Sequence, residues 1–526
     1  MSQILTAEAL KSMLSEPREL ALLDVREHGI FGEGHLFFAI PTPYSRFEAV
    51  LPQLVPNPQV RLVLYDDNDG VATKAAANAE ALGYENVWIL EGGAAAWQAA
   101  GYTLFQGVNL PSKTFGELVE VQRHTPHITA MDLEKLRASG EDFVIVDGRP
   151  LTEHYKMSIP GGICCPNGEL PLRIADIAPD PKTKIVVNCA GRTRSIIGAQ
   201  ILIDVGVKNP IAALENGTQG WFLAGLELEH GATAKYPEVV SSSTRADRLV
   251  GAEAFANRHG ATPVEVSEVQ GWLAEPERTT YVFDVRTPEE FDANGALGTV
   301  HAPGGQLIQT TDQWIGVRGA RIVVVDDDDI RAPVIAGWLQ QLGHEAYSLR
   351  GGLDAARDLS FSCRFGSLEP DACSTMTASE LAAAVRRNDV QMIDIRPSMS
   401  YRKGHIEQAV WSIRPRIGKV IEDAAKPVVL ITDEITVGAL AADDLAKAGV
   451  GDIHIHEGNV GDWRAVGLEI VQTPDLPINE DCIDYLFFTH ERHAGNEAAA
   501  RQYLEWEVGL IDQLDEQERS VFRIKG

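Results

Sequence analysis

The sequence predicts an α/β protein that consists of four tandem domains, each built around a central parallel β-sheet flanked by helices. Three observations support this prediction. An apolar segment ending in Asp-x-Arg occurs four times, a second apolar segment leads into a short loop in each repeat, and a Gly-rich turn closes each repeat. The Asp of the first segment and the first loop residue are 42 positions apart in three repeats and 38 apart in the fourth. Strands that alternate with helices at this spacing pair in parallel through crossover helices.

The first predicted domain spans residues 1–108 and begins with the helix TAEALKSML, which a threonine caps. The segment LLDVR supplies a strand with Asp24 and Arg26 at its end. The segment RLVLYDD supplies a second strand that reaches its loop at Asp66, and EGGAAAW forms the closing turn.

The second predicted domain spans residues 125–231 and follows a joint at 109–124 that contains a helical turn, FGELVEV. Its helix TAMDLEKLR precedes the strand IVDGR, which carries Asp147 and Arg149. The strand KIVVNCA leads to Cys189, and ENGTQGW forms the closing turn.

The third and fourth predicted domains repeat the pattern at 260–358 and 374–472. The third contains VSEVQGWLA, VFDVR, RIVVVDD with Asp326 at the loop, and RGGLDAA. The fourth contains TASELAAAV, MIDIR, PVVLITD with Thr432 at the loop, and EGNVGDW. A polar linker at 232–259 precedes the third domain and runs into a helix.

Residues 473–526 have a different pattern and predict a C-terminal helical extension. The segment NEAAARQYLEWEVGLIDQLDEQER carries an aromatic and aliphatic stripe that includes Tyr503 and Trp506. A stripe at helical spacing indicates packing against the rest of the protein rather than a binding site.

The composition excludes several classes of function. The net charge of −29 over 526 residues disfavours a nucleic-acid or anionic-membrane surface, because both need basic patches. No stretch approaches the ~20 apolar residues that a membrane helix needs. Six cysteines are too few for a disulfide scaffold. We therefore expect a cytoplasmic protein, and its oligomeric state stays open.

The loop CAGRTRS at residues 189–195 has the features of an activated nucleophile. Cys189 lies between a strand end and a predicted helix N-terminus, beside Arg192 and Arg194. The helix dipole and the guanidinium groups favour thiolate over thiol. Successive backbone N–H groups can also bind an anion attached to the sulfur. The pattern predicts a nucleophile that accepts a group from a negatively charged donor.

The Asp-x-Arg strand, the six-residue cysteine loop and the closing turn together resemble the rhodanese (thiosulfate sulfurtransferase) family. The segment RPLTEHYKMSIPGGI at 149–163 is similar to the Arg-Pro-x-x-Glu segment of that family, which leads to Ile-Pro-Gly-Ala. The resemblance extends over about nine-tenths of the chain as four tandem rhodanese-like domains. It implies a four-repeat sulfurtransferase of bacterial type.

The resemblance also implies a mechanism and a site. In the family, the loop cysteine takes the outer sulfur of thiosulfate as a persulfide and passes it to a thiophilic acceptor. Cyanide or a thiol such as glutathione would accept sulfur from Cys189, and no metal or other cofactor is expected.

The substrate-binding residues that the resemblance implies are Ala190, Gly191, Arg192, Thr193, Arg194, Ser195 and Arg149. Arg149 alternatively pairs with Glu153 and braces the loop. Gly217, Thr218 and Trp221 of the closing turn are expected to line the pocket.

Only the second repeat carries a nucleophile at the loop position. Asp66, Asp326 and Thr432 stand there in the other repeats, and none of these side chains can carry a persulfide. The sequence therefore predicts one catalytic repeat and three repeats with a structural or regulatory role.

Two alternatives stay open, and a third is disfavoured. The donor is alternatively 3-mercaptopyruvate, although the loop lacks the Cys-Gly-Ser/Thr-Gly pattern usual in enzymes for that donor. The protein is alternatively a non-enzymatic scaffold of rhodanese repeats. A phosphatase loop of this fold needs an arginine at the position of Ser195, whereas Arg194 comes one residue early.

Overall fold

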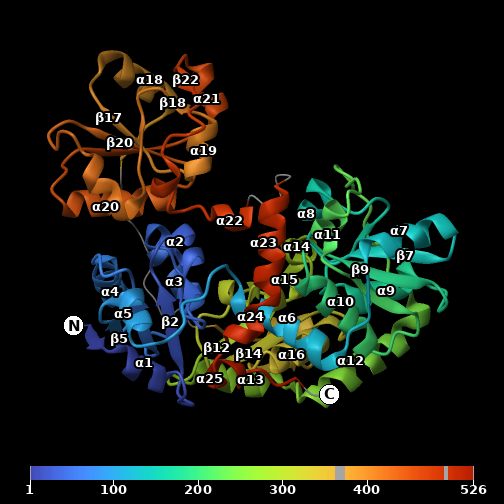
Figure 1. The fold of residues 1–526 in the computed structure, drawn as a ribbon. Helices are drawn as coiled ribbons and strands as arrows, with labels where there is room; N and C mark the ends of the chain where they lie inside the picture. The colour runs from blue at the N-terminus through green and yellow to red at the C-terminus, as the bar shows by residue number, and fades with distance from the viewer. Residues whose placement is uncertain (1, 362–373, 491–495, 525–526) are drawn as a thin grey trace. The chain divides into compact units, whose positions relative to one another are not determined.

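The computed structural model describes residues 2–361, 374–490 and 496–524 (Figure 1). It contains four α/β domains with a parallel sheet each, as predicted, followed by a helical extension. Among the described residues, no helix has both the length and the hydropathy needed to cross a membrane.

The contacts divide the chain into two compact units, and the sequence did not predict this grouping. Unit one contains the first and fourth repeats, in residues 1–14, 21–108 and 363–487. Unit two contains the second and third repeats and most of the extension, in residues 15–20, 109–362 and 488–526.

The first repeat folds around a parallel sheet of strand order β1-β5-β4-β2-β3. Its strands are β1 (Gln3–Leu5), β2 (Leu20–Asp24), β3 (Ile40–Pro41), β4 (Arg61–Tyr65) and β5 (Val87–Leu90). Its helices are α1 (Ala7–Met13), α2 (His28–Glu33), α3 (Phe47–Leu54), α4 (Val71–Ala81) and α5 (Gly93–Ala99). Every residue of β2 and β4 is buried, as expected where helices cover both faces of a parallel sheet.

The fourth repeat has the equivalent strand order, β16-β21-β20-β17-β19. Its strands are β16 (Ser374–Thr375), β17 (Gln391–Asp394), β19 (Val410–Trp411), β20 (Val428–Thr432) and β21 (Ile453–Glu457). Its helices are α18 (Ala378–Arg387), α19 (Ser398–Lys403), α20 (Ile435–Lys447) and α21 (Val460–Ala465). A small antiparallel pair joins β18 (His405–Ile406) to β22 (Ile470–Val471).

Arg414 of the fourth repeat binds the first repeat within unit one. Its guanidinium donates to both carboxylate oxygens of Glu48, at 2.6 and 2.8 Å, and to the carbonyl oxygen of Tyr44 at 3.0 Å. Asp444 of the fourth repeat accepts two further hydrogen bonds from it. Charge-assisted bidentate bonds of this kind therefore hold the two repeats of this unit together.

The second repeat has the strand order β6-β10-β9-β7-β8. Its strands are β6 (His127–Ile128), β7 (Phe143–Asp147), β8 (Ile163–Cys164), β9 (Lys184–Asn188) and β10 (Ile211–Leu214). Its helices are α7 (Ala130–Ser139), α8 (Leu151–Lys156), α9 (Leu170–Ile177), α10 (Thr193–Asp204) and α11 (Gly217–Leu223). The joint before it holds a full helix, α6 (Leu110–Arg123), rather than a single turn.

The third repeat has the strand order β11-β15-β14-β12-β13. Its strands are β11 (Pro263–Val264), β12 (Thr280–Asp284), β13 (Val300–His301), β14 (Arg321–Val325) and β15 (Glu345–Leu349). Its helices are α12 (Arg245–His259), α13 (Val266–Ala274), α14 (Pro288–Asn294), α15 (Gly304–Gln309), α16 (Arg331–Gln341) and α17 (Gly352–Ala356).

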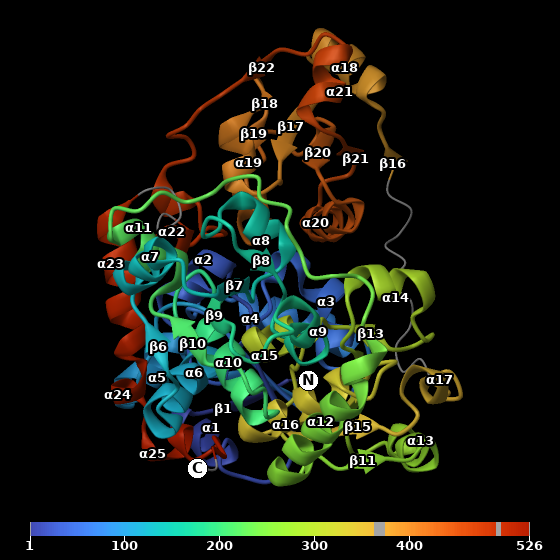
Figure 2. The ribbon, with the colours of Figure 1, turned by 90° about the vertical axis from the view of Figure 1, so that its right-hand side faces the viewer.

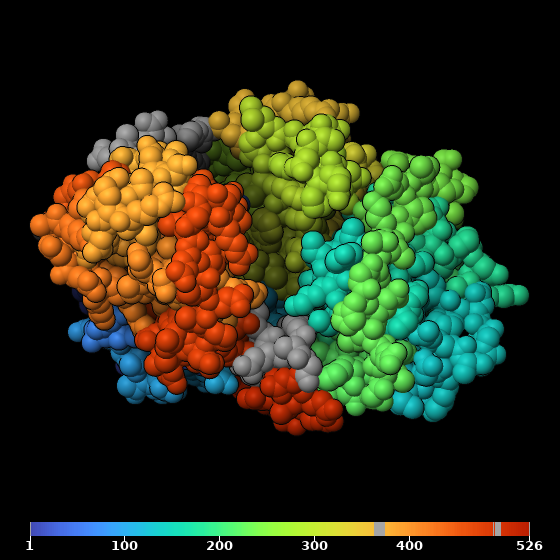
Figure 3. All heavy atoms as spheres, turned by 90° about the horizontal axis from the view of Figure 1, so that it is seen from above, coloured from blue at the N-terminus to red at the C-terminus, as the bar shows by residue number. Residues whose placement is uncertain are grey.

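The extension contains α22 (Phe487–His490), α23 (Glu497–Val508), α24 (Leu510–Gln513) and α25 (Glu516–Arg519). Within unit two, α6 packs against α10 and also against α23 and α24 (Figure 2). Residues 226–238 cross the second repeat as an extended strap, seen as a green band over the teal surface in Figure 3. The strap is held by backbone hydrogen bonds to Ser158 and Cys164.

Threonine caps begin the first helix of three repeats, as the sequence predicts. The hydroxyl oxygens of Thr6, Thr129 and Thr377 accept from the backbone N–H three residues later. The third repeat differs, because Glu265 precedes α13 and makes no side-chain cap. Each cap satisfies a backbone donor that the first helical turn leaves unpaired.

The strand register aligns the loop position in different repeats. The Asp of the Asp-x-Arg segment pairs with the residue just before the loop position, in the pairs Asp147–Asn188, Asp284–Val325 and Asp394–Ile431. The residues that follow are Cys189, Asp326 and Thr432, which therefore occupy equivalent places at the carboxyl edge of their sheets.

Candidate active site

Cys189 is placed by the end of β9 and the beginning of α10. Only residues 189–192 connect the two elements. The cysteine side chain is buried, at 2% exposed, and its Sγ accepts a hydrogen bond from Ser195 Oγ at 2.9 Å. The tight strand-to-helix connection thus holds a hydroxyl donor at the sulfur.

The turn that begins α11 lies directly against this loop. The backbone N–H of Thr218 donates to the carbonyl oxygen of Cys189 at 2.8 Å, and that of Gln219 donates to Ala190 at 3.1 Å. Gly217 has a φ of +52°, and a Cβ atom there would lie 2.2 Å from the Cys189 carbonyl oxygen. The positive φ and the close approach both require glycine. Gly217 and Thr218 therefore face the cysteine loop, as expected.

Trp221 does not face the loop, contrary to the sequence-based expectation. The indole packs in the hydrophobic core with Leu133 and Leu136 of α7. Its Nε1 donates to the carbonyl oxygen of Glu227 at 2.9 Å. Burial of a large aromatic group whose N–H is satisfied accounts for this placement.

Asp147 and Arg149 form a buried bidentate pair at the end of β7. Arg149 donates to the two carboxylate oxygens at 2.8 and 2.6 Å and to the carbonyl oxygen of Met157 at 2.6 Å. His154 Nδ1 lies 3.0 Å from the same carboxylate. Burial alone would raise the pKa of Asp147. The interactions with Arg149 and His154 have the larger effect and lower this pKa to about 2. Arg149 therefore braces the strand end, and it pairs with Asp147 rather than with Glu153.

Replacing Arg149 with methionine is expected to lower the free energy of unfolding by about 3–5 kcal/mol, because it leaves a buried carboxylate without its main partner. Chemical denaturation followed by circular dichroism measures this change. Lys135→Met is the control, since it removes an exposed pair with Asp132 that is worth about 0–1 kcal/mol. A loss of activity without loss of stability would instead assign Arg149 to substrate binding.

Arg194 forms a bidentate pair with Glu153 of α8, at 2.7 and 2.9 Å. Burial disfavours the charge of Arg194, but Glu153 and then Cys189 raise the pKa of this guanidinium above its ordinary value. The ion pair in turn lowers the pKa of Glu153 despite its burial. Arg194 thus lies within electrostatic reach of the cysteine sulfur.

Arg192 points away from the cysteine toward α6. Its guanidinium donates to both carboxylate oxygens of Glu117, at 2.8 and 2.9 Å, and to Glu120. Asn216 accepts a longer bond of 3.4 Å. Burial raises the pKa of Glu117 to about 7. The sequence-based expectation was that the Arg192 guanidinium would be available to an anionic donor. In the structure, two carboxylates already bind this guanidinium.

The corresponding loop of the first repeat surrounds a carboxylate with backbone N–H groups. Asp66 accepts hydrogen bonds from the N–H groups of Asn68, Gly70 and Ala72 at 2.8, 3.1 and 2.9 Å. The N–H groups two, four and six residues beyond the loop position therefore bind an anionic side chain.

The third repeat also surrounds its loop carboxylate with backbone N–H groups, here those three, four and six residues beyond the loop position. Asp326 accepts from the N–H groups of Asp329, Ile330 and Ala332 at 3.2, 3.1 and 2.9 Å. Its buried carboxylate thus caps the helix that follows, as Asp66 does in the first repeat.

The second repeat has the same loop but no carboxylate in it. Counted from Cys189, the positions equivalent to the donors of the first repeat are Gly191, Thr193 and Ser195. Within the described part of the chain, the backbone N–H groups of these three residues donate no hydrogen bond. Donors at the start of a helix bind anions. The loop can therefore accept a negatively charged group attached to the sulfur of Cys189.

Several polar residues around the loop were not found by sequence analysis. They are Glu117 and Glu120 of α6, Gln219 of α11 and Glu507 of α23. Thr193 Oγ1 donates to Glu507 Oε1 at 2.7 Å across a sequence separation of 314 residues. Local motifs cannot reveal such partners, because acidic residues on helices usually face solvent.

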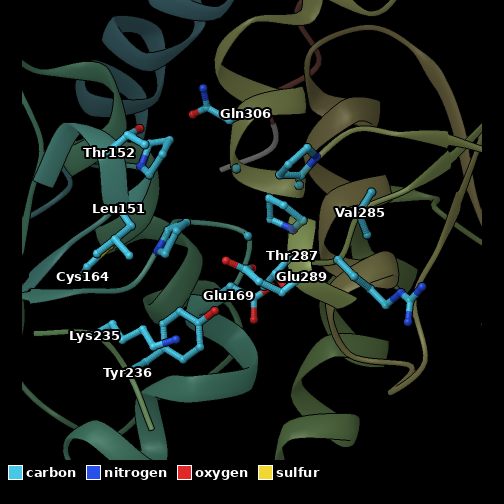
Figure 4. Close-up of a pocket in the computed structure, with 18 of the residues that line it drawn as sticks. Leu151, Thr152, Cys164, Glu169, Lys235, Tyr236, Val285, Thr287, Glu289 and Gln306 are labelled. Carbon is cyan, nitrogen blue, oxygen red and sulfur yellow. The ribbon is translucent and has the colours of Figure 1, made fainter. Parts of the chain in front are cut away.

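A pocket of about 580 Å³ lies between the second and third repeats of unit two (Figure 4). Leu151, Cys164 and Tyr236 line it on one side, and Val285 and Gln306 line it on the other. Burial raises the pKa of the Cys164 thiol to about 12, which keeps it protonated at neutral pH. Among the described residues, no three His, Cys, Asp or Glu side chains converge as metal ligands.

The model of the rhodanese-like domain matches four segments of the chain, residues 6–100, 129–224, 265–358 and 377–466. The crystal structure of a thiosulfate sulfurtransferase from Pseudomonas aeruginosa is similar along the whole length, with a TM-score of 0.91 and 38% identity. The similarity covers 99% of each of the two chains.

A second similarity is confined to one part of the chain. The HTH-type transcriptional regulator Rv0324 of Mycobacterium tuberculosis is 33% identical over 105 residues. These residues make up 20% of this chain and 45% of the regulator, so the chain spans less than half of that relative.

Proposed function

The chain belongs to the rhodanese-like domain family, and from this membership we propose that it is a sulfurtransferase with Cys189 as its catalytic residue. One observation carries the proposal. The loops of the first and third repeats bind a carboxylate, at Asp66 and Asp326, with backbone N–H groups that the second repeat leaves without an acceptor. The terminal sulfur of a persulfide on Cys189 would lie at the place that the side-chain oxygens of Asp66 and Asp326 occupy in their loops.

The first half-reaction loads sulfur onto the enzyme. The Cys189 thiolate attacks the outer sulfur of thiosulfate, a new S–S bond forms, and the S–S bond of the donor breaks. Sulfite leaves with the electron pair of that bond, so no external oxidant is required. The N–H groups of Gly191, Thr193 and Ser195 stabilise the terminal sulfur of the persulfide. Arg194 offsets negative charge during this step, through its electrostatic reach to the sulfur.

The second half-reaction returns the enzyme to its starting state. Cyanide or a thiol such as glutathione attacks the terminal sulfur, and Cys189 leaves as the thiolate. The two half-reactions share one covalent intermediate, so the kinetics are ping-pong. Ser195 Oγ, which already donates to the sulfur, stabilises the thiolate as it leaves.

Intact-mass spectrometry tests this proposal directly. After incubation with thiosulfate and removal of the donor, the protein is expected to be heavier by one sulfur atom. Addition of cyanide is expected to restore the original mass and to release thiocyanate. A protein that stays unmodified with every sulfur donor would support the alternative of a binding or scaffold protein.

The donor is tested by comparing thiosulfate with 3-mercaptopyruvate at matched concentrations. We expect faster loading from thiosulfate, because the loop offers backbone donors to a compact dianion and its sequence differs from that of enzymes for mercaptopyruvate. Faster loading from mercaptopyruvate would keep the role of Cys189 and change the substrate.

A further inference from the structure

The loop of Cys189 is clamped between two helices that lie outside the second repeat. On one side, α6 comes so close that a Cβ atom on Gly116 would lie 2.7 Å from Thr193 Cγ2. On the other side, α23 approaches Gly191, where a Cβ atom would lie 3.1 Å from Glu507 Oε2 and 3.5 Å from Tyr503 Cε1. The extension therefore lies directly against residues that carry the free N–H groups.

The position of α23 is itself held by α6. The Lys113 ammonium group donates to the Tyr503 hydroxyl and lies 4.6 Å from the centre of its ring. It also lies 4.9 Å from the centre of the Trp506 ring. The hydrogen bond to Tyr503 and the cation–π contact with Trp506 hold the helix against α6. The same α6 carries Glu117, which holds Arg192 of the loop.

Glu507 of α23 forms a hydrogen bond with Thr193 of the loop. It is 2% exposed, and Thr193 Oγ1 donates to its Oε1 at 2.7 Å. Its Oε2 and both amide atoms of Gln219 have no hydrogen-bond partner among the described residues. Gln219 Nε2 also lies 3.5 Å from the place of a Cβ atom on Gly191. Burying a carboxylate with an unpaired oxygen is unfavourable for stability, which points to a role other than stability.

We propose that Glu507 of the C-terminal extension is a positioning residue of the active site. Through the Thr193 hydroxyl it holds the first turn of α10 in the orientation that presents the N–H groups to sulfur on Cys189. This inference rests on the proposed function, because it concerns the rate at which that sulfur is received. It makes the extension part of the catalytic machinery of the second repeat.

Four variants of the full-length protein test the proposal. Glu507→Leu removes the acceptor, Thr193→Val removes the donor, the double variant removes both, and Glu507→Gln keeps an acceptor in the same place. Glu505→Leu is the matched control, since Glu505 is exposed on the same helix. The measured quantity is the single-turnover rate of persulfide formation at saturating thiosulfate, together with the midpoint of unfolding.

We expect both single variants to load sulfur on the order of tenfold more slowly, since small displacements of catalytic groups have effects of this size or larger. The double variant is expected to be no slower than either single variant. Glu507→Gln recovers most of the rate, and Glu505→Leu keeps the wild-type rate. The unfolding midpoint of Glu507→Leu is expected to stay close to that of the wild type, because removal of a buried carboxylate oxygen without a partner offsets the loss of the hydrogen bond from Thr193.

A wild-type rate for Glu507→Leu would overturn the proposal, as would additive effects of the two single variants. A rate loss that merely follows a fall in stability would assign Glu507 a structural role instead. Absence of a persulfide in the wild-type protein would contradict the proposed function itself. This outcome is therefore distinguishable from a failure of the positioning role of Glu507.

Discussion

Replacing Cys189 with serine is expected to lower sulfur transfer from thiosulfate to cyanide by at least about 10³-fold. A serine hydroxyl is a weak nucleophile without a general base, and it cannot form a persulfide. The change is nearly isosteric, so the loop and its hydrogen bond to Ser195 are expected to remain. Thiocyanate production and the intact mass after donor treatment provide two independent measurements.

Cys164→Ser is the control for this prediction. Cys164 is also buried in the second repeat and lines the pocket between the second and third repeats. Burial raises the pKa of its thiol to about 12, which disfavours the thiolate. We expect wild-type activity from this variant. Full activity in Cys189→Ser, or loss of activity only in Cys164→Ser, would show that the nucleophile has been assigned to the wrong thiol.

Replacing Gly217 with alanine is expected to lower sulfur transfer by about 10²-fold, because displacement by about 1 Å near a reacting group has effects of this size. The added Cβ would meet the Cys189 carbonyl oxygen at 2.2 Å and the Gly191 carbonyl oxygen at 2.9 Å. The cysteine loop must therefore move. The steady-state rate with thiosulfate and cyanide measures the effect.

Gly225→Ala separates this clash from the strain of a positive φ. Gly225 lies in the same repeat with a φ of +75°, and a Cβ atom there would have nothing within 4 Å. Both variants share a backbone strain of about 1–2 kcal/mol. Only Gly217→Ala should lose activity. Equal losses in the two variants would mean that general destabilisation, rather than displacement of the loop, causes the effect.

The sequence predicted the parts of the molecule that are written in short local patterns. The four strands ending in Asp-x-Arg and the loop at Cys189 are contiguous segments, so their alternation was enough to predict four parallel sheets. The closing turn could also be recognised, because Gly217 and Thr218 are adjacent to a strand end. The residues that specify these strands, the loop and the turn are therefore close to one another in the sequence.

The surroundings of the loop could not be predicted in the same way. Arg192 was expected to face an anionic donor, but its partners Glu117 and Glu120 come from a helix more than 70 residues upstream. Trp221 was expected in the pocket, but burial in the core determined its position. Glu507 comes from a helix more than 300 residues downstream of the loop. Such contacts depend on tertiary packing, which a single sequence does not specify.

The grouping of repeats has a consequence for the order in which the chain folds during synthesis. Glu48 can pair with Arg414 only after a further 366 residues have been synthesised, so the first repeat cannot bind the fourth before then. At about 5–20 residues per second, this interval is about 20–70 s on the ribosome. The second and third repeats leave the ribosome during that time and can fold before the fourth repeat has been synthesised. Because α23 follows all four repeats in the chain, we expect the loop of Cys189 to gain its final support only after the four repeats have been synthesised.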